Sequence, residues 1–393
     1  MKSGRAWIMV LCGTFITLSS AFGQTLTKTT APANYWWSIA SSADGNKLVA
    51  LIGGAPYAKA IYTSSDSGAS WTSNGVPSVE WWSVASSADG MKLVAAAYGS
   101  GGLFTSTNAG AAWASNNLPA YGWFSVASSA DGTKLVVVTG GGQFKGPIFT
   151  STNSGETWLP ANVPSNFWQC VASSADGTRL TAVSITSWYT TTNSGLNWIS
   201  NGMPSVTWNT IACSADGMKL VAPVIIGGTH RLLLSKDSGA TWVTNGAPIS
   251  RVSAVASSAD GAKLVAVEPD RIWLSTDSGA NWTSNNLTGF WRGVAMSSDG
   301  AKYAVIDGGG SSGGIWVSQS IPEPELNLVV SGNKLKASWI IPSADFVLQQ
   351  TSDLTTPNWI TVTNPAALNL NDLQYEVELP PANNHAFFRL ATP

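Results

Sequence analysis

The chain has 393 residues, of which only 11% are charged, and its net charge at pH 7 is −2. This balance offers no electrostatic footprint for nucleic acid or for an anionic membrane surface, so nucleic-acid binding is excluded. The 39 glycines and 19 prolines are typical of a sheet-rich protein in which tight turns join many short strands.

Residues 1–23 have the features of a targeting segment. Lys2 and Arg5 precede an apolar run, and the small-residue site Ala21-Phe22-Gly23 follows it. This order predicts a signal peptide that is removed between Gly23 and Gln24, and therefore a secreted or periplasmic protein. No later apolar run approaches the length of a membrane helix, so we expect no membrane span.

A near-identical phrase, Ser-Ser-Ala-Asp-Gly with a basic residue and an apolar pair close behind, recurs along the chain. Its aspartates, called here the repeat aspartates, are Asp44, Asp89, Asp131, Asp176, Asp216, Asp260 and Asp299. The intervals of 45, 42, 45, 40, 44 and 39 residues are typical of repeat architectures in which each unit is one small β-sheet.

A second motif, Ser/Thr-x-Asp/Asn-x-Gly-x-x-Trp, lies between successive phrases. It is centred on Asp66, Asn108, Asn153, Asn193, Asp237 and Asp277. The pattern resembles the Asp box, or BNR repeat, of sialidases and other β-propellers, and it covers residues 24–320. We expect the Asp or Asn to close an Asx turn, the Gly to take a positive φ, and the Trp to pack against the hairpin. The resemblance implies that the boxes lie away from the active face.

Each repeat is interpreted as one four-stranded blade. In the second repeat the expected strands are Trp82–Ser87, Lys92–Tyr98, Leu103–Thr107 and Ala112–Asn116. The seventh repeat has no Asp box and no fourth strand. Aligning Leu26 with Trp71 predicts that residues 25–30 supply the missing strand and close a seven-bladed ring, which removes its open edges.

The repeat pattern ends at Ser320. Residues 321–325, with two prolines and two acids, are expected to form a stiff linker. Residues 326–393 alternate in the manner of short strands and weakly resemble a small fibronectin-III-like β-sandwich. The predicted fold class is therefore all-β, a seven-bladed β-propeller followed by this sandwich.

Aromatic residues mark the start of most blades, on the face where inter-blade loops are expected. Position −8, eight residues before the repeat aspartate, is Trp36, Trp81, Trp123, Trp168, Trp208 and Trp291, with Val252 as the exception. We expect this set to pack blade against blade. At position −7, Trp37, Trp82 and Phe124 are left with two interpretations, packing or flat platforms on which a sugar could stack.

Four arginines, Arg231, Arg251, Arg271 and Arg292, fall on the same face in blades five to seven. Their guanidinium groups are candidates for binding a carboxylate, sulfate or phosphate. The alternative is that they are solvated loop residues paired with nearby carboxylates.

Evidence for catalysis in the sequence is weak. The Arg-Ile-Pro motif of sialidases is absent, and outside the two motifs Glu80, Glu268, Asp270 and Asp307 are the carboxylates that could serve a glycosidase. The histidines, His230 and His385, fall in different domains, which excludes a Ser-His-Asp triad and a His-rich zinc site. We expect no cofactor and no metal. Cys170 and Cys213 are predicted to be buried thiols without a disulfide.

The sequence therefore favours a secreted, non-catalytic, monomeric propeller that binds a glycan or an extracellular protein through its inter-blade loops. It is similar in this respect to the photosystem II stability and assembly factor family and to Vps10-type receptor propellers. The alternative hypothesis is a divergent glycoside hydrolase of the sialidase or xyloglucanase kind.

Overall fold

The computed structural model describes residues 24–53, 59–119, 121–140, 145–185, 187–201, 207–208, 210–245, 249–285, 287–320, 326–331, 334–340, 347–353, 358–369, 374–379 and 386–391. The predicted signal peptide and linker lie outside these ranges. The chain divides into two compact units, Gln24–Gln319 and a second unit that holds Ser320–Pro393. Within the described ranges, no helix is long and apolar enough to cross a membrane.

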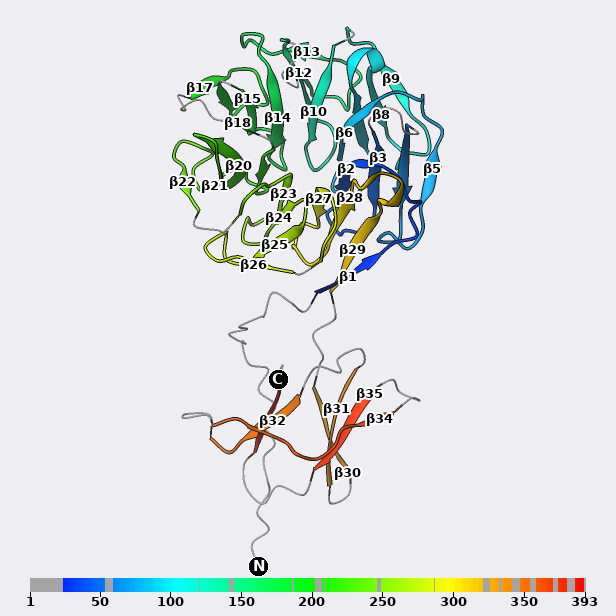
Figure 1. Cartoon of the computed structure of the whole chain (residues 1–393), viewed down its shortest axis with the longest axis vertical. Coiled ribbons are helices and arrows are strands. Elements are labelled where there is room, and N and C mark those ends of the chain that lie inside the picture. Colours follow the sequence, from blue (N-terminus) through cyan, green and yellow to red (C-terminus); the bar gives the residue numbers. More distant parts are fainter. Residues whose placement is uncertain are drawn as a thin grey trace, which may run out of the picture. The chain divides into compact units, whose positions relative to one another are not determined.

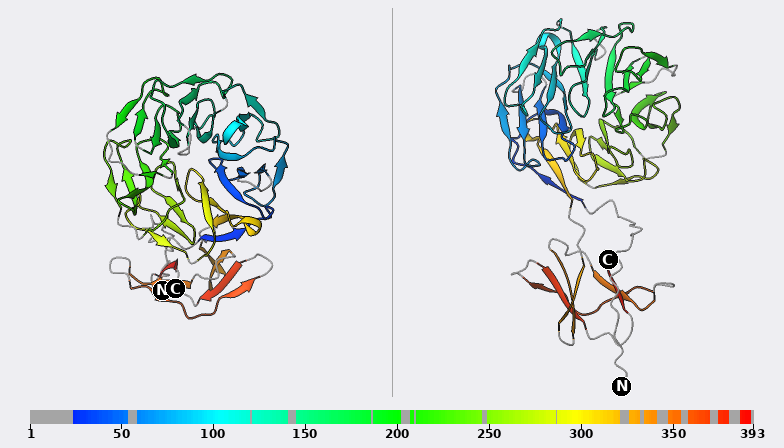
Figure 2. Two further views of the ribbon diagram at one scale, coloured as in Figure 1. Left: turned by 45° about the horizontal axis from the view of Figure 1, so that its top comes forward. Right: turned by 180° about the vertical axis from the view of Figure 1, so that it is seen from behind.

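The first unit is a ring of antiparallel sheets around a central axis (Figure 1, Figure 2). Blade 1 consists of β2 (Trp36–Ser41), β3 (Leu48–Ile52), β4 (Ala60–Ser64) and β5 (Thr72–Asn74). Blade 2 consists of β6 (Trp81–Ser86), β7 (Leu93–Ala97), β8 (Leu103–Ser106) and β9 (Ala114–Asn116). Blade 3 consists of β10 (Trp123–Ser128), β11 (Leu135–Thr139), β12 (Ile148–Ser151) and β13 (Leu159–Pro160). The strands of blade 2 lie within two residues of the predicted bounds.

The next three blades repeat this order. Blade 4 consists of β14 (Trp168–Ser173), β15 (Leu180–Ser184), β16 (Trp188–Thr191) and β17 (Ile199–Asn201). In blade 5 the inner strand is in two pieces, β18 (Thr207–Trp208) and β19 (Ala212–Cys213), followed by β20 (Leu220–Ile226), β21 (Thr229–Ser235) and β22 (Val243–Thr244). Blade 6 consists of β23 (Ala254–Ser257), β24 (Leu264–Glu268), β25 (Arg271–Ser275) and β26 (Thr283–Ser284).

The outer strand of blade 7 comes from the N-terminal segment of the propeller, as predicted. Its strands β27 (Trp291–Met296), β28 (Tyr303–Asp307) and β29 (Ile315–Ser320) are joined at the outer edge by β1 (Gln24–Lys28) (Figure 1). Leu26 packs into the apolar cluster of this blade, as each Asp-box tryptophan does in its own blade. The sequence alignment of Leu26 with Trp71 is therefore confirmed.

The repeat phrases form a closed ring of backbone hydrogen bonds on one face, called here the turn face. The N–H that precedes each repeat aspartate donates to the equivalent carbonyl of the next blade at 2.7 Å, from Ala43 to Ala88 and onward until Ser298 donates to Ala43. Because every blade donates to one neighbour and accepts from the other, the N–H and C=O groups of this turn are satisfied around the ring.

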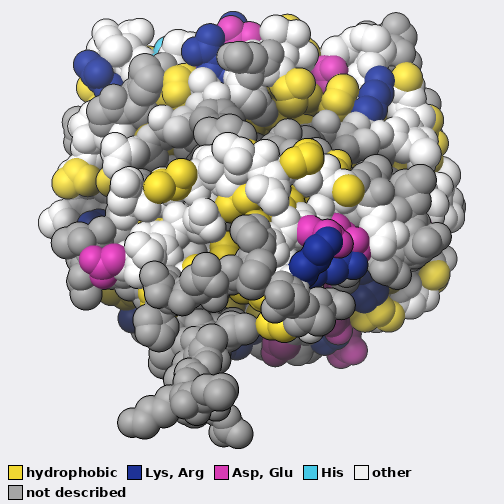
Figure 3. Space-filling view, turned by 90° about the horizontal axis from the view of Figure 1, so that it is seen from below, with side chains coloured by type: hydrophobic (Ala, Val, Ile, Leu, Met, Phe, Trp, Pro, Cys, Tyr) yellow, Lys and Arg dark blue, Asp and Glu magenta, His cyan; other side chains and the backbone are white. Residues whose placement is uncertain are grey.

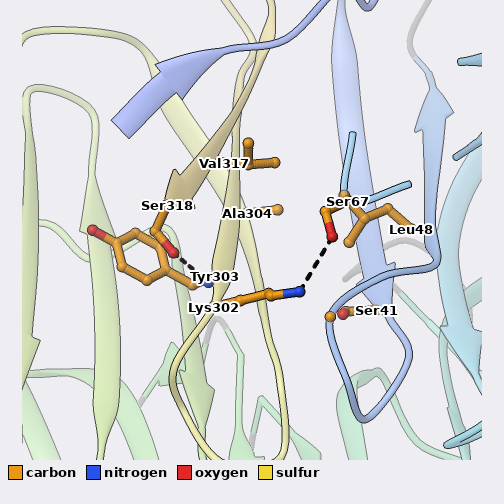
Figure 4. Close-up of a pocket in the computed structure, with 9 residues that line it drawn as sticks. Ser41, Leu48, Ser67, Lys302, Tyr303, Ala304, Val317 and Ser318 are labelled. Atoms are coloured by element: carbon orange, nitrogen blue, oxygen red, sulfur yellow. Dashed lines mark hydrogen bonds between the residues drawn. The ribbon is translucent and has the colours of Figure 1, made fainter. Parts of the chain in front are cut away.

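Lysine side chains also form hydrogen bonds between neighbouring blades on the turn face. Lys47 donates to the carbonyl oxygen of Asp89 at 2.9 Å. At the junction of blades 7 and 1, the amino group of Lys302 reaches Asn46 Oδ1 at 2.7 Å and Ser67 Oγ at 3.3 Å (Figure 4). The junction of blades 7 and 1 is thus also held on the turn face by a lysine side chain.

The Asp boxes share the turn face with the repeat phrases. In the first box Asp66 Oδ1 accepts the backbone N–H of Ser70 at 2.9 Å, and the Trp71 ring N–H donates to the Gly68 carbonyl at 3.1 Å. A positive φ occurs at Gly68, as predicted, but also at the preceding Ser67, with φ of 88° and 58°. This left-handed Ser67 donates its N–H to the Asn46 carbonyl at 2.8 Å, which ties the box to the repeat turn of its own blade.

The core consists of one apolar cluster per blade interface, and the position −8 tryptophans are at its centre. Trp36, Trp81, Trp123 and Trp168 have no exposed surface, and Trp291 is 2% exposed. The packing interpretation of these residues is confirmed. The side chain of Trp208 lies outside the described residues.

The second unit is a small sandwich of two antiparallel sheets. One sheet holds β30 (Asn327–Ser331), β31 (Lys334–Ile340), β35 (Gln374–Leu379) and β34 (Ala367–Asn369), and the other holds β33 (Ile360–Thr361), β32 (Val347–Thr351) and β36 (Phe387–Ala391). Both sheets contribute to one apolar core around Trp339 and Leu348. The specific likeness to fibronectin III stays a prediction.

Candidate functional site

The loop face, which carries the connections between blades and between second and third strands, is where the repeats differ most. The inner strand of five blades has a β-bulge at its start. The pairing register shifts between positions −8 and −6, for example between Trp36 and Ser38 and between Trp81 and Ser83. The residue at position −7 is therefore the extra, bulged residue, and a bulge re-aims a side chain away from the sheet's own alternation.

The bulged residues of four consecutive blades contact one another in a continuous row, called here the stacked row. Its members are Arg292, Trp37, Trp82 and Phe124. The ring centroids of Trp37 and Trp82 are 4.4 Å apart, and those of Trp82 and Phe124 are 4.9 Å apart. The guanidinium carbon of Arg292 lies 3.4 Å from the ring centroid of Trp37. The row runs across blades 7, 1, 2 and 3, and it unites two sets of residues that the sequence analysis had kept separate.

Two tyrosines extend the row. Tyr98, at the end of the second strand of blade 2, lies 5.0 Å from Trp82 between ring centroids. Tyr35, at position −9, lies 5.9 Å from Trp37 and accepts a hydrogen bond at 2.9 Å from Arg292. Sequence reasoning missed both tyrosines, and an alignment of position −9 would not have distinguished Tyr35 from Phe167 and Phe290.

Arg292 is the one charged member of the row. Its side chain is partly buried, which lowers the pKa of the guanidinium from its ordinary value, while the contact with Tyr35 acts in the opposite direction. The guanidinium group of an arginine nevertheless stays protonated when it is buried in a protein. Within the described part of the chain no carboxylate forms an ion pair with it, because the ion pairs found there join Lys334 to Glu378 and Lys336 to Glu376. The row therefore ends in a partly desolvated positive charge that has no anionic partner among the described residues of the propeller.

The residues at position −7 are not of one kind around the loop face. Position −7 is polar in blades 4 and 6, where it is Gln169 and Ser253. Within the row, much of the surface of each ring is in contact with neighbouring rings. Trp82, for example, contacts the rings of Trp37, Tyr98 and Phe124. A sugar stacks on an open ring face, whereas a peptide also makes use of ring edges and of a guanidinium group. The row offers ring edges and a guanidinium group more than open ring faces.

The other three predicted arginines are exposed on the loop face. Arg231 is the third residue of β21 and Arg271 is the first residue of β25, and both occupy the same repeat position, four residues before the first residue of the Asp box. The Arg271 guanidinium carbon lies 5.5 Å from the ring centroid of Trp273. Arg251 precedes the inner strand of blade 6. In the described residues of the propeller no arginine is paired with a carboxylate, and no hydrogen bond joins two of the four.

The four candidate carboxylates are placed differently. Glu268 is buried and accepts the backbone N–H of Arg251 at 2.8 Å and the ring N–H of Trp273 at 3.0 Å. Asp307 accepts the backbone N–H groups of Phe290 at 3.1 Å and Gly309 at 2.9 Å. Both carboxylates therefore brace the backbone. Asp270 is exposed in the tight turn of blade 6, and Glu80 is partly exposed at position −9 of blade 2.

Groups suited to other chemistry are sparse. His230 is partly buried on β21, and His385 lies outside the described residues. Cys170 and Cys213 are free, as predicted; burial raises the pKa of both thiols, that of Cys213 to about 12. Among the described residues no three His, Cys, Asp or Glu side chains are grouped so that they could hold a metal ion. On the face shown in Figure 3, acidic and basic side chains lie together in one group, and the other charged side chains are scattered among uncharged ones.

These features define a seven-bladed Asp-box β-propeller with a non-repeating loop face. No protein-family model matches the chain, and no curated protein matches it either. Solved structures with a similar fold include the following two. One is described as YCF48 bound to D1 peptide, with a TM-score of 0.56 and 13% identity over 75% of this chain and 96% of that chain. The other is Kuenenia stuttgartiensis hydrazine synthase, with a TM-score of 0.59 and 13% identity over 74% of this chain and 96% of that chain.

Proposed function

We propose that the protein is a non-catalytic binding protein that holds a segment of a partner protein across its loop face, against the stacked row. The carrying observation is the row itself, in which Arg292, Trp37, Trp82 and Phe124 replace the polar residues of blades 4 and 6. Aromatic side chains and arginine are the residues that dominate binding energy at protein interfaces.

The placement of the row supports the proposal. It lies on the loop face, away from the closed hydrogen-bond ring of the turn face, so a ligand there would leave the contacts that close the propeller intact. The partly desolvated Arg292 lacks a carboxylate partner among the described residues and so suits a segment that carries an anionic group. The similar structure of YCF48 is a complex with a peptide, which agrees with this kind of ligand. Glycoside hydrolysis has no comparable support, because Glu268 and Asp307 brace backbone amides.

The test is a binding comparison with the full chain. A display library of random peptides and a glycan array are offered to the parent and to Trp82→Gln, a substitution that removes three ring contacts but introduces the residue that position −7 already carries as Gln169. We expect peptides to be selected and Trp82→Gln to weaken their binding about tenfold or more. Leu196→Ser, which removes an apolar side chain that is 72% exposed in an Asp box on the turn face, is the matched control and should bind as the parent does.

Thermal unfolding of each variant separates lost contacts from lost fold. Peptide binding that survives Trp82→Gln unchanged would overturn the role of the row. Capture of oligosaccharides without peptides would overturn the choice of a protein partner.

A further inference from the structure

Phe290 is an exposed aromatic residue on a fixed backbone. It occupies position −9 of blade 7, directly before the buried Trp291, and 58% of it is exposed. Its N–H donates to Asp307 Oδ1 at 3.1 Å and its carbonyl accepts the N–H of Gly308 at 2.9 Å. An aromatic side chain on a backbone that is held on both sides is a rigid apolar surface, and aromatic residues are enriched among the residues that dominate binding at protein interfaces.

The repeat explains why this side chain is uncovered. In blade 1 the residue at position −9 is Tyr35, and it contacts Arg292, which is at position −7 of the preceding blade. At the junction of blades 6 and 7, the residue that corresponds to Arg292 is the one at position −7 of blade 6. That residue is Ser253, which offers neither a ring nor a guanidinium group. Position −7 of blade 6 therefore supplies no contact to Phe290 of the kind that Arg292 supplies to Tyr35.

Blade 6 carries a second anchor at the same repeat position. Arg251 is exposed, and its N–H donates to Glu268 Oε1 at 2.8 Å. Glu268 is 3% exposed and also accepts the N–H of Ser250 and the ring N–H of Trp273. It therefore holds the loop before the inner strand of blade 6 just as Asp307 holds the loop before that of blade 7.

Only these two blades have a carboxylate at this place. Glu268 and Asp307 both lie eight residues after their repeat aspartate, where the other five blades have Ile52, Ala97, Thr139, Ser184 and Val224. Glu268 is buried, and a buried carboxylate is costly unless hydrogen bonds satisfy it. The hydrogen bonds that Glu268 and Asp307 accept fix the backbone at position −9. The departure from the repeat thus coincides with the two exposed side chains.

We propose that Phe290 and Arg251 form an anchor pair on blades 6 and 7 that receives an apolar side chain and a carboxylate of one extended peptide, with Glu268 and Asp307 as positioning residues. The inference rests on the proposed function and names the chemistry of its partner. Phe290 supplies rigid apolar area at little cost in side-chain entropy, and Arg251 supplies planar donors suited to a carboxylate. Phe290 is two residues before Arg292, and Arg251 occupies the same repeat position of the preceding blade, so the proposed segment extends from the stacked row toward blade 6.

The experiment uses peptides selected on the full chain from the random display library. We expect them to carry an Asp or Glu close to an apolar residue, and we expect Phe290→Ala and Arg251→Ala each to weaken their binding about tenfold. The matched control is Phe167→Ala, which removes a phenylalanine at the same repeat position of blade 4 and should change binding little. If peptides lose binding with Trp82→Gln but not with Phe290→Ala, the anchor pair is wrong and the proposed function stands. If no peptide is selected, both are wrong.

Glu268→Gln tests the positioning role. The amide keeps an oxygen for the Ser250 and Arg251 N–H groups but turns a donor toward the ring N–H of Trp273. We expect it to weaken peptide binding in the parent and to have no further effect when Arg251 is already alanine. An equal loss in both backgrounds would show that Glu268 acts on the fold alone and would overturn the positioning role.

Discussion

Replacing Asp131 by asparagine tests whether the repeat turns depend on the negative charge of their aspartates. Asp131 Oδ1 accepts the hydroxyl of Ser129 at 2.5 Å and the N–H of Thr133 at 3.0 Å, and Oδ2 accepts the Thr133 hydroxyl at 2.7 Å. These bonds favour the ionised form and lower the pKa of the carboxyl from 3.8 to about 2, with the Ser129 hydroxyl as the largest cause. Asparagine keeps an acceptor oxygen but removes the charge.

The pKa difference sets an upper limit of about 2.5 kcal/mol on the contribution of this charge to the free energy of unfolding. Because the carboxyl is exposed, solvent screening reduces the expected contribution to about 1 kcal/mol. The folded-state pKa lies below the unfolded one. The stabilisation is therefore complete above the unfolded value of 3.8 and is lost as pH falls through about 2.

The assay is urea unfolding followed by tryptophan fluorescence, in parallel at neutral pH and near pH 2. We expect Asp131→Asn to lower the free energy of unfolding by about 1 kcal/mol at neutral pH and to match the parent near pH 2. Asp270→Asn, which removes an exposed carboxylate that accepts no hydrogen bond within the described part of the chain, is the control and should change neither value. A loss of equal size at both pH values would refute the reasoning, because the charge would then have no part in it.

Three further predictions concern the ring and its core. Gly132→Ala places a Cβ 2.8 Å from the side chain of Lys92 at a φ of +66°, so unfolding should become easier by about 1 kcal/mol or more; urea midpoints equal to those of the parent would contradict this. Leu26→Ala should cost about 1–2 kcal/mol, less than a fully buried leucine, and should raise susceptibility to proteolysis near the N-terminus; a protease pattern like that of the parent would argue against closure by this strand. Cys170 and Cys213 should resist alkylation in the folded protein at pH 8, and rapid labelling measured by mass spectrometry would show that the thiols are accessible.

Local chemistry made the architecture predictable from the sequence. The turn at each repeat aspartate and each Asp box is specified within a few residues, by hydroxyl and carboxylate acceptors and by a glycine with positive φ, as Ser129, Asp131 and Gly132 illustrate. The closing strand was also predictable, because Leu26 and Pro32 keep the spacing of Trp71 and Pro77. The left-handed residue before each Asp-box glycine was not predicted, since it is a serine in five boxes and Ala109 in the other, and neither residue type has a strong preference for that conformation.

The candidate site was only half visible in the sequence. The residues Arg292, Trp37, Trp82 and Phe124 stood out as departures from the repeat, but their union did not. Tyr35 and Arg292 are 257 positions apart, and contact between them follows from ring closure and from a bulge that changes the direction of position −7. Glu268 looked available for catalysis because burial and hydrogen bonding to loop amides cannot be read from its neighbours in sequence.

The two faces of the propeller are under different physical constraints, and this explains where its departures from the repeat gather. On the turn face each phrase touches both neighbouring blades. Its backbone N–H and C=O belong to the closed ring, and a Cβ on Gly90 or Gly177 would meet the lysine of the preceding blade at 2.8 Å. A change in one turn therefore disturbs a neighbouring blade as well. On the loop face the bulged position tolerates arginine, tryptophan, phenylalanine and glutamine, because its side chain leaves the sheet. Binding residues can accumulate there without cost to the closure of the ring, which is why the loop face is the place to seek the partner.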